Sequence, residues 1–406
     1  MLAAVALASA LATAAAPSAA ASAAPMSLAQ AIDFAEAHNP QVLVARSQFF
    51  SAGATLARDR SAQLPNVQGL ASSSMDRQSA NYSTLAQFRG LQPQPNFSEN
   101  TAQVQGSQSI FNLENSLTAN ESRHAYDQAA QNYRLVKEQT YLNVETAFYT
   151  YVQDLQLAAL AQSDLQYQQT LYVIADANYR AGLVAGIDRL KAQVQQTSSE
   201  ESLASSTADA EDARENLAQT IGADPSQTFA VPAAIPAPPM PAIDEHALDK
   251  LAMVKRPDVA MAKDALDIAV IDNGLVDAPN RPTVALQGAV GNQTIPTQIA
   301  TNLLAPPFGC GAPYCSATHF YTIALDSQLL LPLLDWGTRH SAHDSAHVEI
   351  DSQTAAYQTA QRQATIDVDQ AVRRLLVDDQ NLTLATQNAG VAKRAAQIAQ
   401  VQSATR

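Results

Sequence analysis

The sequence predicts an α+β fold that is mainly α, in which long helices are joined to four β-strands and the pattern is duplicated. Three observations support this prediction. Pro40 and Pro65 recur 217 residues later as Pro257 and Pro282. Two long runs contain neither glycine nor proline and carry apolar residues at helical spacing. Four shorter segments alternate apolar with other residues, as half-buried strands do. We therefore expect two repeats, each with short helices, a strand pair and a long helix.

Each repeat is expected to begin with two short helices. Apolar residues on both sides of the first proline match at the same offset, such as Val42 with Val259. Proline disfavours helix at the residue before it, so the first proline of each pair predicts a break between two helices. The second proline predicts the end of the second helix. A repeat of this length is a duplicated half-molecule, because solenoid units are much shorter.

The two runs without glycine or proline are 107–181 and 338–389. Each carries one apolar stripe at steps of three and four, which predicts a continuous amphipathic helix. A helix over most of the first run would be roughly 100 Å long, at about 1.5 Å per residue. Between the halves, the segment 223–242 is dense in proline and is predicted to be a semi-rigid linker.

The predicted strands cover about 66–77, 99–111, 283–292 and 319–331. The second pair is clearer, since Val284, Leu286 and Val290 alternate with residues such as Gln287. One interpretation is a pair of soluble hairpins on a helical body. The other is membrane-spanning strands, which need about ten residues each. Four strands cannot close a barrel and lipid does not tolerate an open sheet edge, so the membrane interpretation requires several chains.

The composition limits where the protein can be located and which partners it can bind. The chain has 24 basic and 38 acidic residues, a formal charge of −14, so it lacks the positive charge of nucleic-acid-binding proteins. Residues 1–24 have the apolar core and small-residue end of a signal peptide, although no Lys or Arg precedes Arg46. We expect an exported protein whose start is incomplete or placed late, with no transmembrane helix.

Two cysteines, Cys310 and Cys315, stand in one short loop and are expected to form a local disulfide in an exported chain. A metal site at this loop would need two further ligands, and only His319 lies near. The sequence contains no nucleophile elbow, no phosphate-binding glycine loop and no Cys/His cluster. We therefore expect no catalytic residues and no cofactor.

Three histidines, His340, His343 and His347, share one face of the second long helix and are a candidate metal site, with Asp344 nearby. The alternative is a ring of polar side chains at a membrane boundary. His124 occupies the position that corresponds to His347 in the first long helix, 223 residues earlier.

Several motifs occur in a fixed order. Three recur in both halves: the Asn-Pro or Arg-Pro helix break, the Leu-Pro or Arg-Pro entry to the first strand, and the strand exits at 109–111 and 332–337. The first half adds the hairpin 179–183 with Asp188 and the closing segment 217–222. Each motif alone is weak, but their order is specific. Over about residues 27–406 the chain resembles the TolC-like outer-membrane efflux proteins.

This resemblance implies a homotrimer in which each chain contributes four strands to a twelve-stranded outer-membrane β-barrel. The long helices would form periplasmic coiled-coil hairpins that continue the barrel as a tunnel. Such proteins are passive exit ducts of tripartite efflux or type I secretion systems, without enzymatic activity. Their partners are a periplasmic adaptor, an inner-membrane RND or ABC transporter, and outer-membrane lipid. Two alternatives stay open, a soluble periplasmic coiled-coil scaffold and a metal-binding protein without a pore.

The resemblance also suggests roles for individual residues. Tyr179, Gly182 and Asp188 correspond to the periplasmic tip that docks the adaptor, although they would equally serve to build the turn. Tyr321 and Trp336 flank the last strand, where aromatic residues gather at membrane interfaces, although ordinary packing explains them as well.

The predicted organisation is a signal peptide at 1–24, a first repeat at 25–222, a linker at 223–242 and a second repeat at 243–406. The second repeat reaches Arg406 before any counterpart of the first hairpin tip. We therefore expect a chain that is C-terminally truncated relative to the family pattern. The acidic constriction of the family follows that second tip, so its residues cannot be assigned, and Asp188 is the one matching acidic position.

Overall fold

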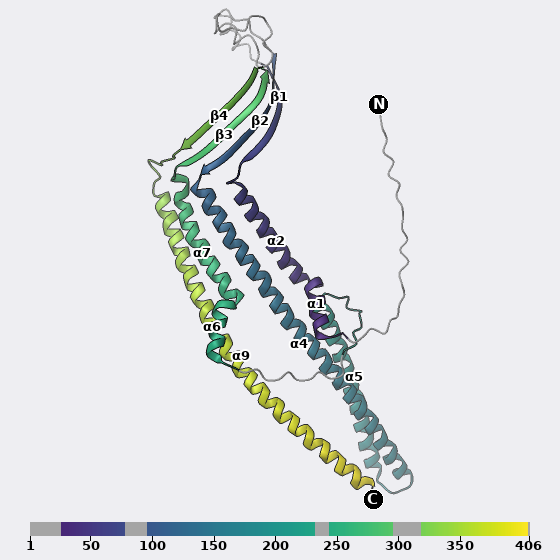
Figure 1. The fold of residues 1–406 in the computed structure, drawn as a ribbon. Helices are drawn as coiled ribbons and strands as arrows, with labels where there is room; N and C mark the ends of the chain where they lie inside the picture. Colours follow the sequence, from purple (N-terminus) through teal and green to yellow (C-terminus); the bar gives the residue numbers. More distant parts are fainter. Residues whose placement is uncertain (1–25, 78–95, 232–242, 295–317, 405–406) are drawn as a thin grey trace, which may run out of the picture. The chain divides into compact units, whose positions relative to one another are not determined.

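The computed structural model describes residues 26–77, 96–231, 243–294 and 318–404, and most of this chain is helical (Figure 1). The predicted signal peptide, the predicted disulfide Cys310–Cys315 and most of the linker lie outside these residues. The elements are α1 (Leu28–His38), α2 (Pro40–Ser61), β1 (Asn66–Arg77), β2 (Asn96–Phe111), α4 (Leu113–Arg180), α5 (Gly186–Ile221), α6 (Glu245–Lys255), α7 (Pro257–Asp277), the short 3-10 helix η1 (Ala278–Asn280), β3 (Thr283–Thr294), β4 (Thr318–Gln328) and α9 (Thr338–Ala404).

The chain divides into two compact units. The first contains Met1–Leu43 and Lys137–Pro238, and the second contains Val44–Val136 and Pro239–Arg406. The second unit therefore combines residues from both sequence repeats.

The first unit has a compact apolar core between α1, the second part of α4 and α5. Its largest fully buried side chains include Phe148, Leu217 and Ile221, and alanines such as Ala31 and Ala35 complete the contact. Small side chains let helix backbones approach closely, while the few large ones fill the remaining volume. Phe229 in the segment after α5 is also buried against this core.

Asn39 makes the break between α1 and α2. Its side-chain oxygen accepts a hydrogen bond from the backbone N–H of Gln41 (2.8 Å), which caps the new helix. Its side-chain nitrogen donates to the carbonyl of Thr220 near the end of α5 (2.7 Å). Because Asn39 is 7% exposed, both ends of its amide are used inside the unit. The proline break therefore also holds α5 in place.

A glycine in the left-handed conformation ends α5. Gly222 has φ 77°, and the N–H of Ala223 donates to the carbonyl of Ala218 (2.8 Å), which forms a Schellman motif. A Cβ at position 222 would lie 2.5 Å from the carbonyl oxygen of His38. The end of α1 therefore fits directly against this glycine.

A pH-dependent contact joins α1 to α4 in the same unit. The carboxylate of Glu36 accepts hydrogen bonds from the Lys137 ammonium and the Tyr141 hydroxyl. These two bonds, that of Lys137 first, hold the pKa of Glu36 below its ordinary value of 4.5. Because the folded-state pKa is the lower one, the contact stabilises the fold above about pH 4.5, and this stabilisation is lost as the pH falls through the folded-state pKa.

We therefore expect Glu36→Gln to lower the midpoint of thermal unfolding at neutral pH. The difference from the unsubstituted protein should narrow as the pH falls below 4.5, the ordinary pKa of Glu36. Circular dichroism melts at several pH values measure this difference. A difference that is constant at all pH values would contradict the role of the Glu36 carboxylate.

In the second unit, the four strands form one antiparallel sheet in the order β1-β2-β3-β4 (Figure 1). The two strand pairs predicted from the repeats are thus joined through β2 and β3. On the helical side, α7 packs along α9. Arg256, just before α7, forms hydrogen bonds with Asp258 (2.7 Å) and an ion pair with Asp367 of α9 (2.8 Å). In the described residues, no helix is both long and apolar enough to span a bilayer.

The mainly helical fold with four strands is confirmed, with some shifted boundaries. β4 ends at Gln328, before the predicted end near 331, opposite Thr283, the first residue of β3. Pro282 precedes Thr283 and has no N–H to donate to a strand partner, which favours an end to the pairing there. Helix α9 continues through Gly390 to Ala404, beyond the run without glycine. A glycine inside a helix costs only about 1 kcal/mol, so it need not end one.

Candidate functional site

The register of the sheet brings most of the large apolar side chains of the four strands to one face. Val104 of β2 lies opposite Val290 of β3, which lies opposite Tyr321 of β4. Leu286 of β3 lies opposite Leu325 of β4. Residues directly opposite each other in an antiparallel sheet point to the same side. The alternation predicted for separate strands is therefore continuous across the sheet.

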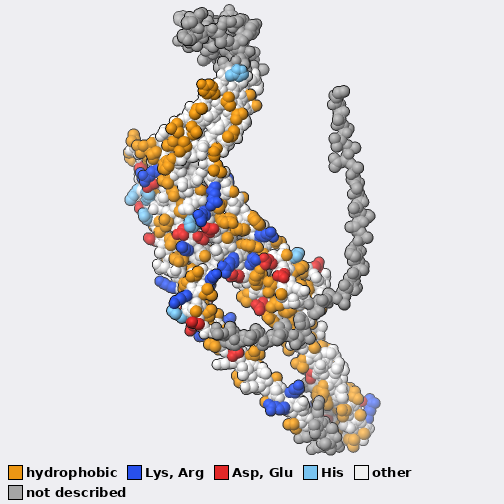
Figure 2. Space-filling model, viewed as in Figure 1, with side chains coloured by type: hydrophobic (Ala, Val, Ile, Leu, Met, Phe, Trp, Pro, Cys, Tyr) orange, Lys and Arg blue, Asp and Glu red, His pale blue; other side chains and the backbone are white. Residues whose placement is uncertain are grey.

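This surface, which we call the apolar face, is exposed. Its large side chains are Val67, Val104, Leu286, Val290, Tyr321, Ile323 and Leu325. Figure 2 shows hydrophobic side chains gathered over the strands, whereas Lys, Arg, Asp and Glu are concentrated on the helices. Soluble monomers rarely expose so continuous an apolar patch, which indicates a lipid or protein environment.

The other side, the polar face, carries mainly uncharged polar residues. Gln103 and Gln105 of β2 lie on it together with Gln68 of β1, and the Gln103 amide donates to the Gln105 amide oxygen (3.2 Å). Gln287 and Thr322 continue the face on β3 and β4. An apolar face opposite a polar face is the pattern of a strand between lipid and water.

Both outer strands have an open edge. Within the described residues, β1 pairs only with β2 and β4 pairs only with β3. The outer N–H and C=O groups of these strands are available to another strand.

The two predicted interface aromatics are both exposed. Tyr321 lies within β4 and is 82% exposed, and Trp336 follows the strand and is 88% exposed. Trp336 has φ 52°, a left-handed conformation that is uncommon for a bulky residue. Asp335 supports the turn, because its carboxylate accepts from the N–H of Gly337 (3.2 Å). Their role at a membrane interface stays a prediction.

The hairpin between α4 and α5 contains the predicted tip residues. Gly182 has φ 73°. Its N–H donates to the carbonyl of Tyr179 (2.9 Å), and the N–H of Leu183 donates to the carbonyl of Asn178 (2.9 Å). These bonds form a Schellman motif, so Gly182 ends α4 as its position suggests. Asp188 lies in the first turn of α5 and is half exposed, with Lys191 3.9 Å away.

Two residues that the sequence analysis did not single out, Asp176 and Arg189, join the two helices of the tip hairpin. The guanidinium of Arg189 lies 5.3 Å from the centre of the Tyr179 ring, and it also approaches Asp176 (3.5 Å). Asp176 forms a second ion pair with Arg180 (2.8 Å). The spacing of Asp176 and Tyr179 on one helix face was visible in the sequence, but their shared partner on the next helix was not. Around these contacts, large apolar side chains are exposed: Leu183, Ile187, Leu190 and Val194.

The three histidines of α9 do not gather as one set of ligands. His343 lies 3.1 Å from the side-chain oxygen of Asn273 and 3.2 Å from the carboxylate of Asp277 on α7. His340 approaches Asp344 at 3.5 Å, and His347 is exposed. In the described part of the chain, the one group of three potential metal ligands whose atoms lie within 4.8 Å of one another is instead His124, Asp264 and Asp267.

A family model for outer membrane efflux proteins matches residues 31–223 and 248–405. The chain belongs to the outer membrane efflux protein family. The two matched blocks correspond to the two sequence repeats, and the resemblance to TolC-like proteins is confirmed. Comparison with curated protein sequences found no match.

Solved outer membrane channels share the fold of this efflux family member. The CmeC channel of Campylobacter jejuni is 16% identical with a TM-score of 0.63, and the match covers 82% of this chain and 67% of the CmeC chain. VceC of Vibrio cholerae is 16% identical with a TM-score of 0.65, and the match covers 85% of this chain and 78% of the VceC chain. The open-state MtrE channel of Neisseria gonorrhoeae is 20% identical with a TM-score of 0.66, over 89% and 76%.

Family membership places the protein in the outer membrane, with a large periplasmic part. Members of this family are channels rather than enzymes, and they work with adaptors and inner-membrane pumps. The exposed apolar face of the sheet agrees with an outer-membrane location.

Proposed function

We propose that this efflux family member is a passive exit duct through the outer membrane, for small molecules in an efflux system or for proteins in type I secretion. The observation that carries the proposal is the four-stranded sheet with an apolar face, a polar face and two open edges. The apolar face would contact outer-membrane lipid, with Tyr321 and Trp336 at its boundary. The polar face would line the water-filled lumen.

The open edges require a closed ring of copies, and the family resemblance makes that ring a homotrimer in this proposal. Lipid cannot hydrogen-bond the free backbone groups of an edge strand, so β1 of one copy must pair with β4 of the next. Four strands enclose no lumen, whereas the twelve strands of three copies enclose an aqueous one. In this arrangement 25–222 and 243–406 are the structural repeats, joined by the linker 223–242 after a signal peptide at 1–24.

Extraction and gel migration test this assembly. The protein should sediment with outer membranes, require detergent for extraction, and migrate as a three-chain species that heating converts to one chain. A protein that is soluble without detergent would support a periplasmic scaffold and would contradict the duct.

The tip hairpin is the proposed docking site for a periplasmic adaptor, which would connect the duct to an inner-membrane RND or ABC transporter. Tyr179, Gly182 and Asp188 build this tip. The exposed apolar side chains beside them, such as Leu183 and Ile187, offer the adaptor a hydrophobic surface. Asp188 adds a negative charge beside this surface.

Reversal of this charge tests the docking role. Asp188→Lys should weaken adaptor binding by about a hundredfold or more and reduce efflux, because a like-charge contact at an interface costs several kcal/mol and each 1.4 kcal/mol is about tenfold. Trimers should form normally, since Asp188 is half exposed and has only a long contact to Lys191. Glu201→Lys, an exposed substitution further along α5, is the matched control. Equal efflux and adaptor binding in both variants would contradict a docking role for Asp188.

A further inference from the structure

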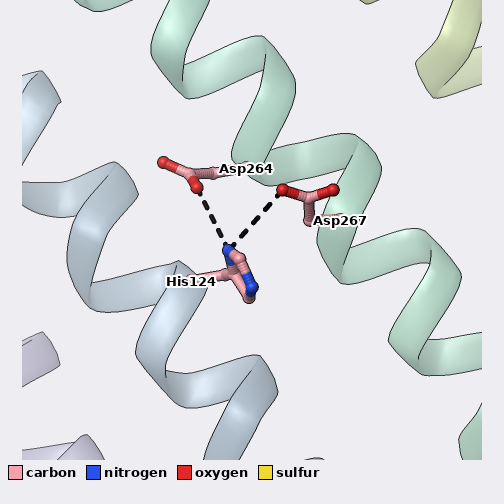
Figure 3. A group of neighbouring side chains, drawn as sticks. All are labelled: His124, Asp264 and Asp267. Atoms are coloured by element: carbon pink, nitrogen blue, oxygen red, sulfur yellow. Dashed lines mark hydrogen bonds and ion pairs between the residues drawn. The ribbon is translucent and has the colours of Figure 1, made fainter.

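A histidine and two aspartates from different helices meet in the second unit. The Nδ1 atom of His124 on α4 lies 3.1 Å from a carboxylate oxygen of Asp264 and 3.9 Å from one of Asp267, both on α7. Figure 3 shows the imidazole pointing at the gap between the two carboxylates. The three ligand atoms all lie within 4.8 Å of one another.

These separations fit a small metal ion. Zinc binds histidine nitrogen and carboxylate oxygen at about 2.0–2.2 Å, so neighbouring ligand atoms in a tetrahedral site are roughly 3.3–3.5 Å apart. The distances of 3.1 and 3.9 Å fall on either side of this value. Small side-chain movements would therefore complete the site. A simple His–Asp hydrogen bond explains Asp264, but it does not explain why Asp267 also faces the ring.

The electrostatic environment favours a cation. Within the described residues, neither Asp264 nor Asp267 has a Lys or Arg partner, so two carboxylates face one imidazole. Nearby on the same two helices, burial and the charge of Asp272 raise the pKa of Glu121. Among the described residues, Asp264, Asp267 and Glu121 therefore have no Lys or Arg in an ion pair with them.

We propose that His124, Asp264 and Asp267 bind one divalent transition-metal ion of the zinc type. In the metal-bound state the Nδ1 atom of His124 would carry no proton, and the neutral ring would hold its one proton on Nε2. Imidazole with carboxylates suits this class of ion rather than Cu(I), which prefers sulfur. The side chains are 17–39% exposed, so water can fill the fourth position. Because α4 follows the strands of the first repeat and α7 precedes those of the second, the ion would link the two repeats.

Zinc titration of the purified full-length protein in detergent tests this site. Calorimetry should show about one Zn²⁺ ion bound per chain. His124→Gln and Asp267→Asn should each weaken zinc binding by about tenfold or more. Loss of a residue that only hydrogen-bonds a metal ligand already lowers metal affinity by about 10–100-fold. His347→Gln is the matched control, because His347 is an exposed histidine of α9 outside the cluster.

Thermal melts of the same proteins provide a second measurement. Zinc should raise the melting temperature of the unsubstituted protein and of His347→Gln, but not that of Asp267→Asn. If His124→Gln does not fold, Asp267→Asn decides, since Asp267 is the most exposed of the three ligands. Absence of zinc binding, or equal binding by the Asp267→Asn and His347→Gln variants, would overturn the proposal.

Discussion

Replacement of Gly222 with alanine is expected to destabilise the first unit by about 3 kcal/mol. Left-handed backbone costs an L-residue about 1–2 kcal/mol, and Gly222 has φ 77°. The new Cβ would also lie 2.5 Å from the carbonyl oxygen of His38, a backbone atom that cannot rotate away. The end of α1 must therefore move from α5. Thermal unfolding followed by circular dichroism, with the yield of folded protein, measures the loss.

Gly182→Ala is the matched control, because it separates the two costs. Gly182 has a similar φ of 73°, but an added Cβ meets nothing within 4 Å. Only the backbone cost of about 1–2 kcal/mol should appear, and it should be confined to the tip hairpin. Equal losses in the two variants would contradict the importance of the contact between Gly222 and His38.

A charge on the apolar face of the sheet should have the second large effect. Val290 lies on β3, between Val104 and Tyr321 on the neighbouring strands. Arginine on the lipid side of a transmembrane strand costs about 2–4 kcal/mol near the bilayer centre. Val290→Arg should therefore sharply reduce the amount of heat-modifiable trimer in outer membranes, as measured on unheated gels.

The control for this experiment lies on the same strand. Gln287 is on the polar face, opposite Ala324 of β4, and its replacement by arginine would place the charge in the lumen. Gln287→Arg should assemble normally and change only the passage of charged solutes. If Gln287→Arg were as harmful as Val290→Arg, the assignment of the two faces would be wrong.

Much of the fold could be predicted because its signals are local. The absence of glycine and proline over 107–181 predicted α4, and alternation at 283–292 predicted β3. The matching prolines at 40 and 257 predicted the helix breaks, since proline acts on its immediate neighbours. The signal for the turn at the tip was equally local. Gly182 has the positive φ that its position between two helices suggested.

The contacts between distant segments could not be predicted. His124 was noted only as the counterpart of His347, yet its partners Asp264 and Asp267 are about 140 residues away on α7. Helical periodicity indicates which face of α4 is apolar, but it does not say which helix covers that face. For the same reason, the shared face of the three histidines on α9 made them a candidate metal site but did not indicate that His343 contacts Asp277 on α7.

The central claim is that the chain forms a water-filled pore, and conductance in planar lipid bilayers tests it most directly. Purified trimer added to one side should produce discrete current steps without any energy source, because the proposed duct is passive. Val290→Arg should produce few steps, since it should insert poorly. A protein that is trimeric and inserted in the bilayer, but that gives no current steps under these conditions, would contradict the claim.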